Sequence, residues 1–194
     1  MDDQPQTARK RRWTIVHWAT VMCVAAVLAA TLFAAMGWTR EKMHRAMCLS
    51  NLHCCTLSFF MYADEFGGRF PVDEKLTLIG SFELLSNWAT TARIYFCPSD
   101  SRPGARFSTS YSGLTTKNVS YSYVPNLLSH DDKTNVILWL DRIYTTERGT
   151  RWPRDGNHRD AGGNVAFTDV HTEFFAELPC DLRDKDGQSI VLSP

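Results

Sequence analysis

The feature that most constrains this chain is a long stretch near its N-terminus without formal charge. Residues 13–38 contain no Asp, Glu, Lys or Arg. As an α-helix the stretch would span about 39 Å, at about 1.5 Å per residue, which exceeds the roughly 30 Å hydrocarbon core of a bilayer. Trp13 and Trp38 lie at its two ends, where indole rings favour the headgroup region. The stretch therefore predicts a transmembrane helix rather than a buried core helix.

A cleaved signal peptide is the alternative to a retained anchor, with the basic run at 9–12 as its charged n-region. The apolar stretch is longer than the usual h-region of about 7–15 residues, and no small-x-small cleavage site follows it. We therefore expect a retained anchor. The basic run carries four positive charges, against three from Arg40, Lys42 and Arg45 on the other flank. This difference favours a cytoplasmic N-terminus.

The rest of the chain predicts one small extracytoplasmic domain. We expect a disordered cytoplasmic tail over 1–12, the transmembrane helix over 13–38, the domain over 39–180 and a peripheral C-terminal tail over 181–194. The helix itself should continue to about Asp64, because no Pro or Gly interrupts the chain between Gly37 and Phe66, and Gly67-Gly68 then ends it. Its domain half carries an apolar stripe at helical spacing, formed by Met43, Met47, Cys55, Phe59 and Tyr62.

Beyond the helix the pattern is mixed, which predicts an α+β fold. Residues 81–88 favour a short helix with Ser81 as its N-cap. Residues 119–124 and 136–140 are typical of strands, and 165–175 of a hairpin. The formal net charge is zero and the pI is near 7, which argues against a dedicated nucleic-acid binder.

The cysteines offer one candidate disulfide. Cys48 lies on the predicted helix, and Cys97 lies in a proline-turned loop that could fold back onto it. In an oxidising compartment a Cys48–Cys97 bridge would close a loop worth about 4 kcal/mol in the entropic model. The alternative is a pair of small buried apolar residues. No pair of C-x2-C motifs indicates a zinc site, and we predict no metal and no cofactor.

The segment 158–171 (HRDAGGNVAFTDVH) combines histidines and aspartates with a Gly-Gly pair. It favours a glycine-rich turn entering the hairpin, with local hydrogen bonds from His158 and Asp169. A metal-dependent periplasmic enzyme that uses His158, Asp160, Asp169 and His171 is a further class of function. No Ser or Cys nucleophile motif accompanies them, so we expect no enzyme.

Several segments, taken in order, resemble one bacterial family. They are 45–52 (RAMCLSNL), 59–71 (FFMYADEFGGRFP), 96–100 (FCPSD), Ser122-Tyr123 followed by Asn126, and 158–170. They resemble the R-x-x-C-x-x-N-L, M-Y-A-D-x-x-x-G-x-x-P, F-x-C-P-S-D, S-Y-x-x-N and H-x9-D-G patterns of prepilin-like proteins, relatives of the major pseudopilin of type II secretion. The resemblance covers residues 13–175. It implies a pilin-like fold, in which a long N-terminal helix packs on a small antiparallel sheet.

Two departures from the family pattern concern processing and the hairpin. A prepilin presents G-F-T-L-I-E at the membrane edge, whereas this chain has Arg12, Trp13 and then His17 at the position of the glutamate. A neutral imidazole cannot pair with a neighbouring subunit's N-terminal amine as a carboxylate does, which puts cleavage and filament assembly in doubt. Ten residues separate His158 from Asp169, and Val170 replaces glycine; because a β-branched residue disfavours positive φ, we expect no tight Asp-Gly type of turn.

The sequence thus predicts a non-enzymatic, single-pass protein of the bacterial inner membrane, with its domain in the periplasm. Its expected partners are the lipid bilayer and other pilin-like subunits or secretion-system components. A membrane-tethered sensor or ligand-binding module that no longer assembles into filaments is the alternative.

Overall fold

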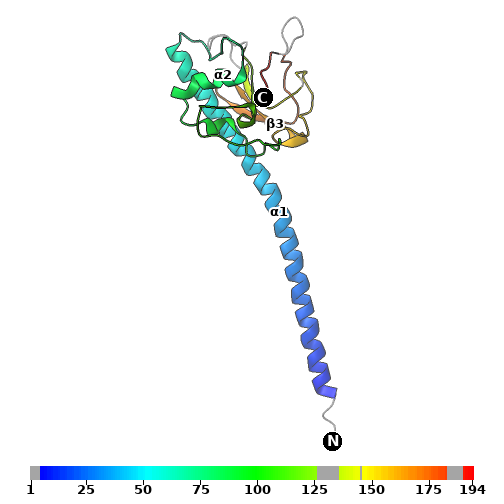
Figure 1. Cartoon of the computed structure of the whole chain (residues 1–194). Helices are drawn as coiled ribbons and strands as arrows, with labels where there is room; N and C mark the ends of the chain where they lie inside the picture. The colour runs from blue at the N-terminus through cyan, green and yellow to red at the C-terminus, as the bar shows by residue number, and fades with distance from the viewer. Residues whose placement is uncertain (1–4, 126–135, 145, 183–189) are drawn as a thin grey trace. The chain divides into compact units, whose positions relative to one another are not determined.

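The computed structural model describes residues 5–125, 136–144, 146–182 and 190–194. Within these residues it has an α+β fold, as predicted (Figure 1). The helices and strands are α1 (Pro5–Glu65), α2 (Leu78–Glu83), β1 (Tyr121–Tyr123), β2 (Ile137–Asp141), β3 (Gly163–Phe167) and β4 (Thr172–Phe175), with short 3₁₀ helices η1 (Leu84–Asn87), η2 (Ala92–Tyr95), η3 (Thr116–Asn118) and η4 (Arg159–Ala161).

Helix α1 begins at Pro5 rather than at Trp13, so residues 5–12 are helical and not disordered as expected. Proline suits the first helical turn, because its φ is already helical and an N–H there would have no partner. The Ala, Arg and Lys residues that follow are good helix formers. At the other end Gly67 and Gly68 adopt positive φ, and the Gly68 N–H donates to the Ala63 carbonyl over 2.8 Å. These glycines end the helix where the sequence predicted.

The chain divides into two compact units, Met1–Lys42 and Met43–Pro194. The first unit contains the charge-free part of α1, whose described apolar side chains, such as Leu28, Leu32 and Phe33, are exposed. Among the described residues, α1 is the one helix that is long and apolar enough to cross a membrane. Its length and composition are consistent with single-pass membrane anchoring.

The second unit contains a four-stranded antiparallel sheet in the order β1-β2-β3-β4. Each strand pairs with its neighbour in sequence, so the sheet is a meander, and β3 and β4 form the predicted hairpin. The tail predicted to be peripheral returns to this sheet, since Tyr123 and Leu192 exchange backbone hydrogen bonds of 2.9 and 2.8 Å. It returns because Tyr123 lies on β1, an edge strand with unpaired backbone groups.

The domain half of α1 contributes one fully buried face to the core. Its members recur every three or four residues: Cys48, Leu52, Cys55, Phe59 and Ala63. The ring of Phe59 packs edge-on against Trp139 of β2, with ring centroids 4.4 Å apart. The predicted stripe was therefore right at two of its members, Cys55 and Phe59. It was wrong at Met43 and Met47, which are exposed because they lie on a different face of the helix.

The short helix α2 begins earlier than predicted. Its N-cap is Thr77, whose hydroxyl accepts a hydrogen bond from the Gly80 N–H over 3.2 Å. The predicted N-cap, Ser81, lies inside the helix, where its hydroxyl donates to the Thr77 carbonyl and accepts from the Asp73 N–H. Two possible caps four residues apart made the sequence pattern ambiguous, and the more N-terminal one prevails.

The hairpin turn between β3 and β4 corrects a second expectation. Val170 adopts a positive φ of 72°, so this β-branched residue takes the backbone conformation that the family pattern gives to glycine. The turn closes through hydrogen bonds from Val170 N to the Phe167 carbonyl and from Phe167 N to the His171 carbonyl, each 3.0 Å. The neighbouring strand pairing outweighs the local steric cost, which is about 1–2 kcal/mol for an L-residue in this region.

We predict that Val170→Gly stabilises the chain by about 1 kcal/mol, because glycine removes the steric cost, although it adds backbone entropy to the unfolded state. Chemical denaturation in detergent, followed by circular dichroism, measures the change. The control is Val72→Gly, at a valine without positive φ that packs against the core, which should lose stability. A Val170→Gly chain less stable than the native one would contradict the prediction.

Candidate functional site

The helix segment and the cysteine turn that suggested the family resemblance contact each other. Cys48 of α1 and Cys97 form a disulfide with their Cα atoms 5.4 Å apart, the pairing that the sequence favoured. Three residues along α1, the Asn51 amide donates to the Phe96 carbonyl over 3.0 Å. The segment 96–100 is therefore fixed to the helix by a covalent bond and a hydrogen bond from the same helix face.

The end of this turn holds a buried carboxylate. The side chain of Asp100 accepts hydrogen bonds from the Arg102 guanidinium, the shortest at 2.6 Å, and from the Ser120 hydroxyl at 2.7 Å. Burial acts to raise the pKa of Asp100, but the hydrogen bonds and charge of Arg102 and the bond from Ser120 outweigh it, so the pKa lies below the usual value. The turn is thus held to the start of the sheet by an ionised group.

His158, the first residue of the predicted motif, is buried directly beside the disulfide. Its Nε2 atom lies 3.6 Å from Cys97 Sγ, and only 3% of the residue is exposed. The aromatic ring of Phe174 on β4 lies 6.1 Å from the imidazole, between ring centroids. Arg45 of α1 in turn lies over Phe174, with the guanidinium carbon 4.5 Å from the ring centroid. The helix, the disulfide and the hairpin therefore enclose this histidine.

Behind His158 lies a buried polar group that we call the Asp141 cluster, defined as Asp141, Asn157, His158 and Asn164. Asp141 ends β2, and its carboxylate accepts hydrogen bonds from Asn157 Nδ2 (2.5 Å), Asn164 N (2.6 Å) and Asn164 Nδ2 (2.8 Å). His158 Nε2 lies 3.5 Å from Asp141 Oδ2 and 2.9 Å from Asn164 Nδ2. The cluster thus joins β2, β3 and the loop before η4.

Burial raises the pKa of Asp141, and the nearby His158 and the amide donors act in the opposite direction. The side-chain oxygens of Asn157 and Asn164 are buried and have no hydrogen-bond partner among the described residues. Such groups in a fully enclosed site are costly. The Asp141 cluster therefore keeps polar side chains in the core of the domain, two of them with oxygens that are unpaired within the described part of the chain.

The Gly-Gly pair of the motif permits close packing around this cluster. A Cβ atom on Gly163 would overlap the indole ring of Trp152, and one on Gly162 would overlap the ring of Phe174. Gly162 also has a positive φ of 139°. The pair is required by packing as well as by the turn, in line with the predicted glycine-rich entry to the hairpin.

The other residues of the segment 158–171 do not join His158. Asp160 is exposed, with its carboxylate 3.9 Å from the Arg154 guanidinium. Asp169 is bonded to His171 at the exposed hairpin turn. Among the described residues, the donors close enough to share a metal ion are instead Cys48, Cys97 and His158. The four residues considered for a metal-dependent enzyme therefore lie in three different environments.

The residues of the predicted processing region all lie within α1. Trp13 and His17 are exposed. The side chain of Arg12 lies outside the described residues, and so does Asn126 of the predicted S-Y-x-x-N pattern.

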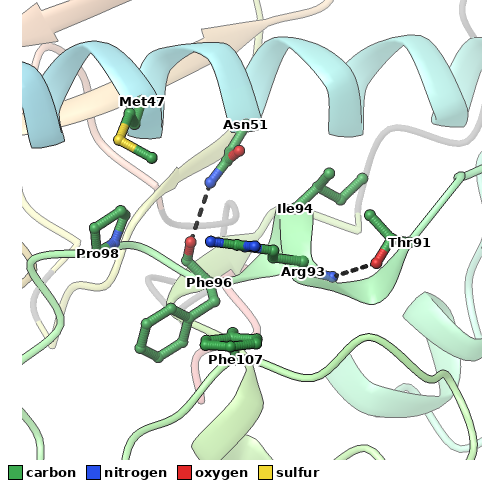
Figure 2. A pocket seen from close by; sticks show the side chains of 8 residues that line it. All are labelled: Met47, Asn51, Thr91, Arg93, Ile94, Phe96, Pro98 and Phe107. Carbon is green, nitrogen blue, oxygen red and sulfur yellow. Dashed lines mark hydrogen bonds between the residues drawn. The ribbon is translucent and has the colours of Figure 1, made fainter.

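A shallow pocket lies between α1 and η2 (Figure 2). Its volume is about 200 Å³. Arg93 reaches across it and lies over the ring of Phe107, 4.8 Å from the ring centroid. The lining combines this cation with apolar groups, one amide and one hydroxyl: Met47, Asn51, Thr91, Ile94, Phe96, Pro98 and Phe107.

Comparisons of the chain with protein-family models, with curated proteins and with solved structures find no significant match. The resemblance to prepilin-like proteins therefore stays a prediction from the motifs.

The sequence predicted the disulfide and singled out His158, for which it favoured local turn contacts, but it missed Asp141, Asn157 and Asn164. One signal was present in the sequence, because Asp141 directly follows the apolar run at 136–140 that predicts a strand. An aspartate at the end of such a strand indicates a buried polar partner. Nothing local indicated that Asn157 and Asn164 supply the donors.

We predict that Asp100→Asn lowers the free energy of unfolding by about 1–3 kcal/mol at neutral pH, because it removes a buried charged acceptor. The folded pKa of Asp100 is lowered, so its contribution is present above the unfolded value of about 3.8 and is lost as pH falls through the folded value. The difference between the native chain and the variant should therefore shrink below pH ~3.8.

Denaturation curves at several pH values measure this difference. Asp160→Asn is the matched control, since it alters an exposed ion pair worth less than about 1 kcal/mol. A deficit in Asp100→Asn that stays constant down to the lowest pH would contradict the assignment.

Proposed function

We propose that this chain is a non-enzymatic, membrane-anchored protein of the pilin-like type, related to the pseudopilins of type II secretion and type IV pili, with a structural or interaction role. In this proposal the N-terminus is cytoplasmic and the domain lies in the periplasm of a bacterial inner membrane. Support comes from the charge-free part of α1, from the α+β layout of the second unit, and from the contacts among the family-like segments around Cys48 and Cys97.

The observation that carries an interaction role is a second apolar face on the domain half of α1. Met43, Met47, Leu57 and Met61 are each between 43% and 54% exposed. Together with the exposed Cys54 they recur at helical spacing along one stripe, which we call the outer face. The opposite face, from Cys48 to Ala63, is fully buried in the domain.

An amphipathic helix normally has one apolar face, so a second one on the same helix favours a partner. Thioether side chains adapt their shape to irregular neighbours, which suits packing against another helix. We therefore assign the outer face to contacts with another pilin-type helix. Arg12 and His17, which depart from the prepilin pattern, favour an unprocessed anchor over a cleaved filament subunit.

We predict that the full-length chain stays in the membrane pellet after washes with high salt and with alkaline carbonate, because about 20 apolar residues suffice to span a bilayer. N-terminal analysis of this material should find an intact N-terminus that begins before Arg12. Release of the chain into the soluble fraction would contradict anchoring, and a start at Trp13 would instead indicate a processed pilin subunit.

We further predict that mild oxidation of native membranes links Cys54 to a partner chain in a complex that a thiol reductant dissociates. Cys54→Ser should abolish this product, whereas Cys180→Ser, at a partly buried thiol, should not. Replacing Met47 and Met61 by glutamine should lower the linked fraction at least about 10-fold, because each apolar side chain contributes about 1 kcal/mol or more when buried. A linked fraction that does not respond to these glutamines would contradict the outer face as an interface.

The pocket of Figure 2 favours the second candidate, a tethered ligand-binding module. Its exposed cation beside apolar side chains suits a small anionic ligand with an apolar part. Co-purification separates the two candidates, since a filament-related protein should bring pilus or secretion components with it. A ligand-binding module should purify without these components, and Arg93→Gln should weaken the binding of its ligand.

A further inference from the structure

The donors that gather around the disulfide come from distant parts of the chain. The sulfur atoms of Cys48 and Cys97 and Nε2 of His158 all lie within 4.8 Å of one another, and all three residues are buried. Cys48 comes from α1, Cys97 follows η2, and His158 precedes η4. Two sulfurs and one imidazole nitrogen are a donor set that zinc prefers in proteins.

We propose that the reduced chain binds one Zn²⁺-type cation between Cys48, Cys97 and His158, and that the Asp141 carboxylate moves toward these three donors to take the fourth position. The disulfide and the metal site are then alternative states of the same link between α1 and the turn at Cys97. This inference goes beyond the interaction role proposed above and does not depend on it.

Two distances already fit a tetrahedral zinc site. Bond lengths of about 2.3 Å to sulfur and about 2.0–2.1 Å to nitrogen place those two donors about 3.6 Å apart. Cys97 Sγ and His158 Nε2 are separated by 3.6 Å. A nitrogen and a carboxylate oxygen in such a site should lie about 3.4 Å apart, and His158 Nε2 lies 3.5 Å from Asp141 Oδ2.

Two parts of the site must change, because the Asp141 carboxylate must approach the sulfurs and the two sulfurs must separate. A dithiol reductant would transfer two electrons and two protons to the Cys48–Cys97 bond, breaking it into two thiols and becoming a cyclic disulfide itself. Binding of the cation then displaces both thiol protons to solvent and holds the sulfurs apart as thiolates. The cation also replaces the present contact of His158 Nε2 with the Asn164 amide, 2.9 Å away.

The surroundings supply the support that such a site needs. Asp141 is oriented by donors from Asn157 and Asn164, which is the role of outer hydrogen bonds in metal centres. A dication also offsets the charge of two buried thiolates, and the amide donors of Asn157 and Asn164 stabilise the remaining charge of the Asp141 carboxylate. The site could not be predicted from the sequence, because its donors form no short motif.

The test uses the full-length chain in detergent, reduced with a dithiol, freed of reductant without air, and titrated with Co²⁺ as an optical probe. We expect one ion per chain, with thiolate-to-cobalt absorption and the visible bands of tetrahedral Co²⁺, displaced by one equivalent of Zn²⁺. The oxidised chain should show neither absorption. Cys97→Ser and His158→Gln should weaken binding at least about 10-fold, whereas Cys54→Ser and Cys180→Ser should not.

A second measurement keeps the test decisive if a variant fails to fold. Alkylation of the reduced native chain, followed by peptide mass spectrometry, should show that Zn²⁺ protects Cys48 and Cys97 among its six cysteines. Absence of thiolate absorption in the reduced chain would overturn the proposal. Protection of the adjacent Cys54 and Cys55 instead would overturn it as well, because it would place the ion elsewhere on α1.

Discussion

The packing of Phe59 between the helix and the sheet is the contact on which the rest of the domain depends. Its ring meets Trp139 of β2 at 4.4 Å and Tyr123 of β1 at 5.1 Å, both edge-on, an arrangement that aromatic quadrupoles favour. Tyr123 also pairs through its backbone with Leu192, so the C-terminal segment returns beside the strand that Phe59 contacts. Removing this ring would leave a cavity where α1 meets two strands.

Once α1 packs on the sheet, the ends of the neighbouring helices and strands determine which groups surround the buried polar site. Cys48 lies about three turns before Phe59 on the same helix face, which brings the turn at Cys97 to the end of β2 where Asp141 lies. Asp141 then needs donors, and Asn157, His158 and Asn164 are the groups within reach. The disulfide thus does more than close a loop, since it forms one wall of a buried polar site.

Local patterns predicted the elements well, but they did not predict how the elements meet. The helix end at Gly67-Gly68 and the strands rest on periodicity and turn chemistry, which act within a few residues. The sequence pattern placed Met43 and Met47 on the buried face. Both are apolar residues at helical spacing, and the sequence alone does not show which apolar face of a helix packs against the sheet. Val170 was misjudged for a similar reason, since strand pairing on both sides imposes a backbone that the residue alone disfavours. The Asp141 cluster draws on segments far apart in sequence, which no local pattern can join.

An exposed apolar face of moderate size binds a partner more readily on a membrane-anchored helix than on a helix that is free in solution. Association in solution must overcome several kcal/mol of lost translational and rotational freedom. Confinement of two anchored chains to one membrane raises their effective concentration, so part of that cost is already met. Met43, Met47, Leu57 and Met61 are each only about half exposed and would bury a modest area. Such a face would give weak association in solution, and it becomes sufficient for the proposed helix contact when α1 also anchors the chain.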